Sequence, residues 1–138
     1  MSTEDVIRRW EKAVNGHDAI AVGSIYTKDA PISDPSYPEP LIGAEGARKD
    51  AESYLKAFPN MTARILRMAS NGDFVMGEVQ FHGTNSGPME TPAGVIPPTN
   101  RSLELHVAFA ARVNAQGLIS EERRYYDTTA FMKALGLA

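Results

Sequence analysis

The spacing of hydrophobic residues divides the chain into a helical first part and a strand-rich second part. Apolar residues recur at helical spacing over residues 3–15, and they do so again over residues 44–58. A second, shorter helix is expected to begin at His17 and Asp18. Residues 34–43 contain three prolines, so the pattern predicts an irregular segment there.

Alternation of apolar and polar residues predicts strands in the second part of the chain. The expected strands cover residues 62–69, 74–84, 101–113 and 117–127. Residues 85–100 contain four prolines, and we expect a long irregular loop there. A terminal helix is expected to begin at Thr128, directly after the last strand.

Helices followed by a meander of long antiparallel strands indicate an α+β fold. We expect a single domain over residues 1–138, in which a curved antiparallel sheet wraps around the N-terminal helices. Such a sheet has the shape of a cone and encloses a cavity. Enclosed cavities of this kind are the usual binding sites of small molecules.

Composition narrows the classes of partner and chemistry. The chain has 17 acidic and 14 basic residues and no basic run, which disfavours nucleic acid and anionic membranes as partners. It has no Cys, no apolar run of about 20 residues and no signal peptide at its N-terminus, so we expect a cytoplasmic protein. Its three His residues are scattered without metal-ligand spacing, so no metal site is expected.

Asp127 and Asp34 are the candidate catalytic residues, and each has a structural alternative. Asp127 lies where the last strand meets the terminal helix, so its carboxylate either caps that helix or enters a pocket. Alternation along this strand predicts that Arg123, Tyr125 and Asp127 share a face with Ile119. Asp34 precedes a proline, a context typical of a turn. In an apolar pocket either carboxylate would become a stronger base.

Aromatic, basic and imidazole side chains complete the predicted site. As substrate-binding candidates we select Trp10, Tyr26, Tyr37, Tyr54, Phe58, His82, Phe109, Arg123 and Tyr125. Most of these aromatic residues fall on apolar stripes, where a role in the core is the alternative. For His82 the alternative is a structural histidine.

Two stretches carry a resemblance to a known family. The first is DPSYPEPLIG at residues 34–43 and the second is GLISEERRYYD at residues 117–127. Together with the order of helices and strands, these stretches resemble the SnoaL-like polyketide cyclases of the nuclear transport factor 2-like superfamily. The resemblance covers nearly the whole chain, and it implies the conical fold, no cofactor and a homodimer.

The resemblance also implies roles for particular residues. In ketosteroid isomerases, which share the fold, the residue at the Asp34 position is the general base, and the oxyanion donors fall at Trp10 and Phe109 here. In limonene-type epoxide hydrolases one Asp matches Asp127, while their Arg-x-Asp pair falls near residues 78–80, where this chain has Glu-Val-Gln. SnoaL-like cyclases use an Asp at the Asp127 position as the general acid and base of an intramolecular aldol closure.

The sequence thus predicts a cofactor-free acid/base enzyme that acts on a small, apolar, oxygenated substrate. Polyketide cyclase or isomerase chemistry is the first hypothesis. The alternatives are an epoxide hydrolase of the limonene type and a non-catalytic module that binds a small molecule or a protein.

Overall fold

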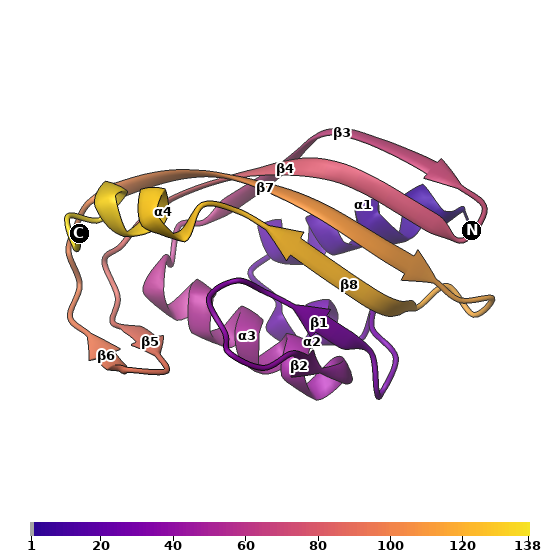
Figure 1. Cartoon of the computed structure of the whole chain (residues 1–138), viewed down its shortest axis with the longest axis horizontal. Coiled ribbons are helices and arrows are strands. Elements are labelled where there is room, and N and C mark those ends of the chain that lie inside the picture. The colour runs from indigo at the N-terminus through magenta and orange to yellow at the C-terminus, as the bar shows by residue number, and fades with distance from the viewer. Residues whose placement is uncertain (1) are drawn as a thin grey trace.

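The computed structural model describes residues 2–138, in which a six-stranded sheet wraps around helices and a separate two-stranded sheet lies at one end (Figure 1). The helices are α1 (Thr3–Asn15), α2 (Ala19–Gly23), α3 (Gly43–Ala57) and α4 (Thr128–Ala134). The strands are β1 (Pro31–Ser33), β2 (Leu41–Ile42), β3 (Thr62–Asn71), β4 (Phe74–Thr84), β5 (Met89–Thr91), β6 (Gly94–Ile96), β7 (Ser102–Val113) and β8 (Ile119–Tyr125). The α+β class predicted from the sequence is confirmed.

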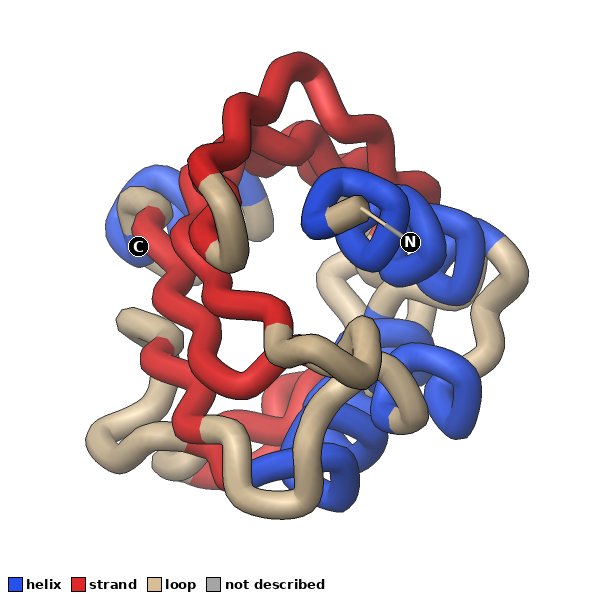
Figure 2. The backbone as a smooth tube through the Cα atoms, turned by 90° about the vertical axis from the view of Figure 1, so that its right-hand side faces the viewer, coloured by secondary structure: helices blue, strands red, loops and turns tan. Residues whose placement is uncertain are grey.

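The main sheet has six strands in the order β2-β1-β8-β7-β4-β3. The long strands β3, β4, β7 and β8 form an antiparallel meander, whereas β1 pairs with β8 in parallel and a parallel bridge joins Tyr26 to Ile119. In Figure 2 the strands curve around one side of an interior whose other side is formed by the helices. This curvature confirms the predicted wrapping of the sheet around the N-terminal helices.

Helix α1 begins and ends where its sequence predicts. Ser2 and Asp5 form a capping box, in which each side chain accepts from the other residue's backbone N–H. At the other end of the helix, the Asn15 amide bonds to both backbone groups of Ala63, at 2.7 and 2.8 Å. These bonds attach the end of α1 to β3, so the helix is fixed against the concave face of the sheet.

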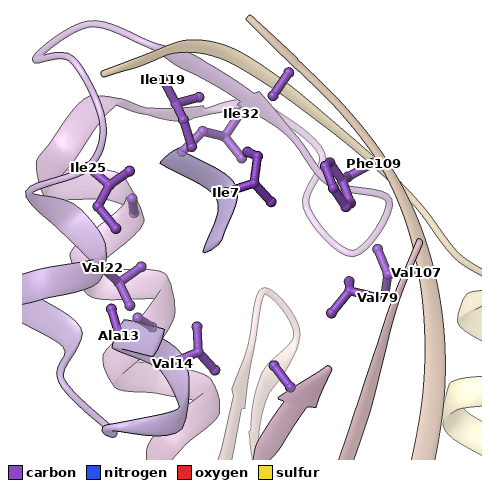
Figure 3. Close-up of a cluster of buried hydrophobic side chains, with 14 of the residues drawn as sticks. Ile7, Ala13, Val14, Val22, Ile25, Ile32, Val79, Val107, Phe109 and Ile119 are labelled. Atoms are coloured by element: carbon purple, nitrogen blue, oxygen red, sulfur yellow. The ribbon is translucent and has the colours of Figure 1, made fainter. Parts of the chain in front are cut away.

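The hydrophobic core lies between α1, α2 and the concave face of the sheet (Figure 3). Val6 and Val14 of α1 are fully buried, as is Ile119 at the start of β8. Gly77 of β4 makes room for this packing, because a Cβ atom at that position would lie 2.8 Å from the Phe109 ring.

The segment at residues 85–100 differs from the predicted irregular loop, because it contains the short hairpin of β5 and β6. Asn85 is fully buried and holds the base of this hairpin. Its amide nitrogen donates to the carbonyl oxygens of Ala57 and Gly87, and its amide oxygen accepts from Thr99. A buried amide with all these bonds stabilises the segment despite its four prolines.

Strand β8 also differs from its prediction, because a bulge interrupts its alternation. Arg112 of β7 pairs with Glu121 while the next residue, Val113, pairs with Ile119, so Ser120 is an extra residue. Beyond this bulge Glu122 is buried and Arg124 and Tyr126 are half-buried, whereas Arg123, Tyr125 and Asp127 are exposed. The predicted grouping of Ile119 with Arg123, Tyr125 and Asp127 on one face is therefore wrong.

The homodimer expected from the resemblance stays a prediction. Size-exclusion chromatography coupled to light scattering can test it. The helices of residues 2–138 include none that is both long and apolar enough to span a bilayer.

Candidate functional site

A cavity of about 530 Å³ lies between the concave face of the sheet, α1, α3, α4 and the β5–β6 hairpin. Its walls are mostly apolar and include Ile7, Phe58, Val79, Phe81, Leu105 and Val107. Several of these residues also belong to the core cluster or pack against it, so core and cavity wall coincide in this fold. Polar side chains on the wall come mainly from α3, β8 and the turn after β1.

Asp34 lies on the cavity wall, and its side chain is only 7% exposed. Its Oδ1 atom accepts from the Ser36 backbone N–H at 2.8 Å and from the Tyr126 hydroxyl at 2.6 Å. Its Oδ2 atom accepts from Arg124 Nη1 at 3.1 Å. A carboxylate oxygen has two acceptor positions, so Oδ2 retains one for a further proton or donor. Asp34 thus forms the expected Asx turn and also lines the cavity.

Arg124 is the centre of the polar part of the wall. It donates from Nη1 to Asp50 at 2.7 Å and from Nε to Glu122 at 2.6 Å, in addition to its bond with Asp34. Burial opposes the charge of this guanidinium, but the neighbouring carboxyl groups of Glu122 and Asp50 outweigh that effect and raise the pKa of Arg124. Arg124 therefore stays charged and fixes three carboxyl groups from three segments of the chain.

Three phenols donate to these carboxyl groups. Tyr37 bonds to Asp50 at 2.9 Å, Tyr26 bonds to Glu122 at 2.6 Å, and Tyr126 bonds to Asp34. The Tyr126 hydroxyl also contacts the Ser36 hydroxyl at 2.5 Å.

The environment of the three phenols keeps them protonated. Burial raises the pKa of Tyr26, Tyr37 and Tyr126, and the bonded carboxyl groups add to the effect. These phenols therefore remain neutral hydrogen-bond donors throughout the physiological pH range.

Most of the predicted substrate-binding residues line the cavity. The structure brings together Trp10, Asp34, Tyr37, Tyr54, Phe58 and Phe109 on its wall. Tyr26 is buried outside the lining, and its hydroxyl bonds to Glu122, which does line the cavity.

Besides Tyr26, four predicted site residues lie outside the cavity. Asp127 is exposed, and its carboxylate caps α4 by accepting from the Ala130 N–H at 3.0 Å. The bulge in β8 directs Arg123 and Tyr125 to the exposed outer face of the sheet. His82 of β4 is exposed on the same face, and in the β-sheet its backbone lies opposite that of Glu104 in β7. The alternative in which Asp127 is a helix cap is thus the one that the structure supports.

Asp50, Glu122, Arg124 and Tyr126 line the cavity but were not selected from the sequence. Asp50 had a signal, because it lies four residues before Tyr54 and three after Ala47, on the apolar stripe of α3. Glu122, Arg124 and Tyr126 had no such signal in the sequence, because the bulge that turns them toward the cavity has no distinct sequence signature. Over residues 2–138, His, Asp and Glu side chains form no group of three suited to a metal ion.

Comparison with known proteins gives a family match and structural neighbours. The model of the SnoaL-like polyketide cyclase family matches residues 4–135. IdmH, a candidate polyketide cyclase from Streptomyces antibioticus, is 26% identical, with a TM-score of 0.77 and coverage of 99% of both chains. A candidate SnoaL-like cyclase from Jannaschia is 17% identical, with a TM-score of 0.83 over 99% of this chain and 92% of that one.

A third structural neighbour is named for a different reaction. SalBIII, an epoxide hydrolase/cyclase-like enzyme of pyran ring formation in salinomycin, is 18% identical, with a TM-score of 0.76 over 93% of this chain and 92% of its own. At this identity the likeness concerns the fold alone. No curated protein matches the sequence.

Proposed function

Because the chain belongs to the SnoaL-like polyketide cyclase family, we propose that it is a cofactor-free acid/base enzyme that closes a ring in a small, apolar, oxygenated substrate. Asp34 is the proposed general base. The observation that carries this proposal is the Asp34 carboxylate, which is almost completely buried at the polar end of an otherwise apolar cavity. IdmH, which shares 26% identity over the whole chain, supports the same reaction class.

The hydrogen bonds of Asp34 suit it to this role. Arg124 and Tyr126 fix the orientation of the carboxylate, while Oδ2 keeps a free acceptor position. The apolar wall suits a ketone of low polarity, and the carboxylate at its polar end is placed to take up a proton from a carbon atom of such a substrate. The network thus holds a base beside an apolar substrate without a metal ion or an organic cofactor.

The proposed reaction is an intramolecular aldol closure. Asp34 removes a proton from the carbon next to a ketone, and the electrons of the C–H bond form an enolate. The enolate carbon then attacks a second carbonyl carbon of the same molecule, which forms the new C–C bond. The oxygen of that second carbonyl takes the proton back from Asp34, so the carboxylate is regenerated and the atoms balance.

The test uses the first step alone, with β-tetralone as a two-ring ketone probe. In deuterium oxide, wild-type protein is expected to speed exchange of the protons next to the carbonyl above the rate without protein. Asp34→Asn should reduce this catalysed rate by at least about 100-fold, because an amide cannot accept the proton. Proton NMR measures the exchange.

Asp127→Asn is the matched control, since it is the same substitution at the carboxylate that caps α4. It should leave the exchange rate unchanged and lower the free energy of unfolding by no more than about 1 kcal/mol. Equal loss of exchange in both variants would contradict the assignment to Asp34. Wild-type protein that binds the ketone but gives no exchange would favour the alternative of a non-catalytic binding module.

Epoxide opening is the second candidate, and one observation favours it. Arg124 bridges the carboxyl groups of Asp34 and Asp50, which gives the Asp-Arg-Asp arrangement that epoxide hydrolases of this fold use. However, Gln80, which lies where the resemblance places their Arg-x-Asp pair, bonds to Glu104 and does not line the cavity, so Tyr54 is the residue left there to hold a water. Hydrolysis of limonene oxide at a rate that Asp34→Asn abolishes would support this candidate over ring closure.

A further inference from the structure

Tyr54 of α3 is the tyrosine of the polar cluster whose hydroxyl has no protein partner. It lines the cavity, and within residues 2–138 no acceptor or donor bonds to its hydroxyl. The charged groups of Asp50, Arg124 and Glu122 lie close enough to the Tyr54 phenol to influence its pKa. No fully buried side-chain oxygen or nitrogen in the described chain lacks a partner, so this hydroxyl has to reach open space. The cavity is the open space that Tyr54 lines.

A second donor without a protein partner, Nη2 of Arg124, belongs to the same polar cluster as the Tyr54 hydroxyl. Its three hydrogen bonds come from Nε and Nη1, so Nη2 has no acceptor within residues 2–138. By the same reasoning Nη2 reaches open space, since fully buried donors are all bonded. Because three carboxyl groups fix the guanidinium, the direction of Nη2 is set before any ligand binds.

We propose that the Tyr54 hydroxyl and Arg124 Nη2 form a binding site for the carbonyl oxygen of the substrate, next to the carbon from which Asp34 takes a proton. The site deepens the proposed function and rests on it for its catalytic consequence. The ligand is a neutral ketone, because three carboxyl groups face one guanidinium at this end of the cavity and disfavour a substrate that arrives as an anion.

The two donors act when the proton leaves carbon. Negative charge then moves from the Asp34 carboxylate to the ketone oxygen, so a donor at that oxygen stabilises the enolate more than the ketone. Burial raises the pKa of Tyr54, and nearby Asp50 adds to this, so its phenol stays protonated and can donate. Arg124 bonds to Asp34 through Nη1 and would bond to the ketone through Nη2, so its positive charge would lie between the carboxylate that loses negative charge and the ketone oxygen that gains it.

Tyr54→Phe tests the site, because it removes the hydroxyl and keeps the ring that packs against the core. The measurement is the infrared carbonyl band of bound β-tetralone labelled with carbon-13 at the carbonyl. In wild-type protein the band should lie at lower frequency than in Tyr54→Phe, since a hydrogen bond weakens the C=O bond. The dissociation constant should rise about fivefold, and the catalysed proton exchange should fall by about 100-fold.

Two further variants sharpen the assignment. Tyr125→Phe is the matched control, because Tyr125 is exposed on the outer face of the sheet, and it should leave band, affinity and exchange unchanged. Trp10→Phe removes the indole N–H of Trp10, the cavity-lining residue at which the resemblance to ketosteroid isomerases places an oxyanion donor. If the band moves in Trp10→Phe and not in Tyr54→Phe, or if the ketone does not bind at all, the proposed carbonyl site is wrong.

The outcomes separate this proposal from the proposed function. A Tyr54-dependent band together with exchange that survives Asp34→Asn would overturn the base and leave the carbonyl site intact. A band that Tyr54→Phe does not change, together with exchange that Asp34→Asn abolishes, would overturn the carbonyl site and leave the base intact.

Discussion

The two faces of β8 and its C-terminal continuation carry the same three residue types, and only one face belongs to the cavity. The inner face has Glu122, Arg124 and Tyr126, and the outer face has Glu121, Arg123 and Tyr125. Every inner side chain bonds to another segment of the chain, whereas Tyr125 is 55% exposed on the outer face. The comparison shows that residue type alone does not assign a role here, because the bulge at Ser120 decides which set meets the cavity.

The largest difference between the two faces is expected at the arginines. Arg124→Met should lower the free energy of unfolding by about 3–5 kcal/mol, because it leaves three buried carboxyl groups without their cation. Arg123→Met should change it by about 0.5 kcal/mol or less, since that side chain is exposed. Urea denaturation followed by circular dichroism measures both.

Arg124→Lys extends this comparison if Arg124→Met fails to fold. A lysine keeps the charge but loses the planar fork that reaches several carboxyl groups at once, so its stability should fall between wild type and Arg124→Met. Equal stability of the Arg124 and Arg123 variants would mean that the inner cluster contributes nothing to folding.

The glutamates should show a smaller difference of the same kind. Glu122→Gln weakens the 2.6 Å bond with Arg124 Nε and removes the charge that faces it, at a cost of about 2 kcal/mol. Glu121→Gln affects a 3.7 Å pair with Arg112 on the outer face, which is worth less than about 1 kcal/mol. The midpoint of urea denaturation compares them, and a larger shift for Glu121→Gln would contradict the assignment of faces.

The long helices and strands followed from local patterns, which is why their prediction succeeded, whereas the short strand β2 lies in a segment predicted to be irregular. The stripe of α1, the asparagine and glycine that end it and the alternation of β7 are each encoded within a few residues. The order of helices before long antiparallel strands predicted the wrapping of the sheet, and the resemblance implied the same conical fold. The hairpin at residues 85–100 was not predicted, because it depends on Asn85 reaching Ala57 and Thr99.

The site was predictable only in part, and for a physical reason. Asp34 and the aromatic wall were found because motif and apolar stripe coincide with the cavity in this fold. The cluster around Arg124 joins Asp34, Asp50 and Glu122, which are far apart in sequence, through a strand whose alternation shifts by one residue. One extra residue in a strand exchanges its faces, so strict alternation selected the outer set.

The smallest difference is expected at the tyrosines, and it depends on pH. Tyr126→Phe removes the bond to Asp34 and should cost about 1 kcal/mol at neutral pH, whereas Tyr125→Phe should cost almost nothing. Burial and the bond to Asp34 raise the pKa of Tyr126 above its ordinary value of 10.0, so its contribution is complete below pH 10.0 and is lost as pH rises further. The stability gap between wild type and Tyr126→Phe should therefore narrow above that pH. A gap that widens in alkaline urea denaturation would show that the phenol ionises more easily in the folded protein, which a buried donor to a carboxylate does not do.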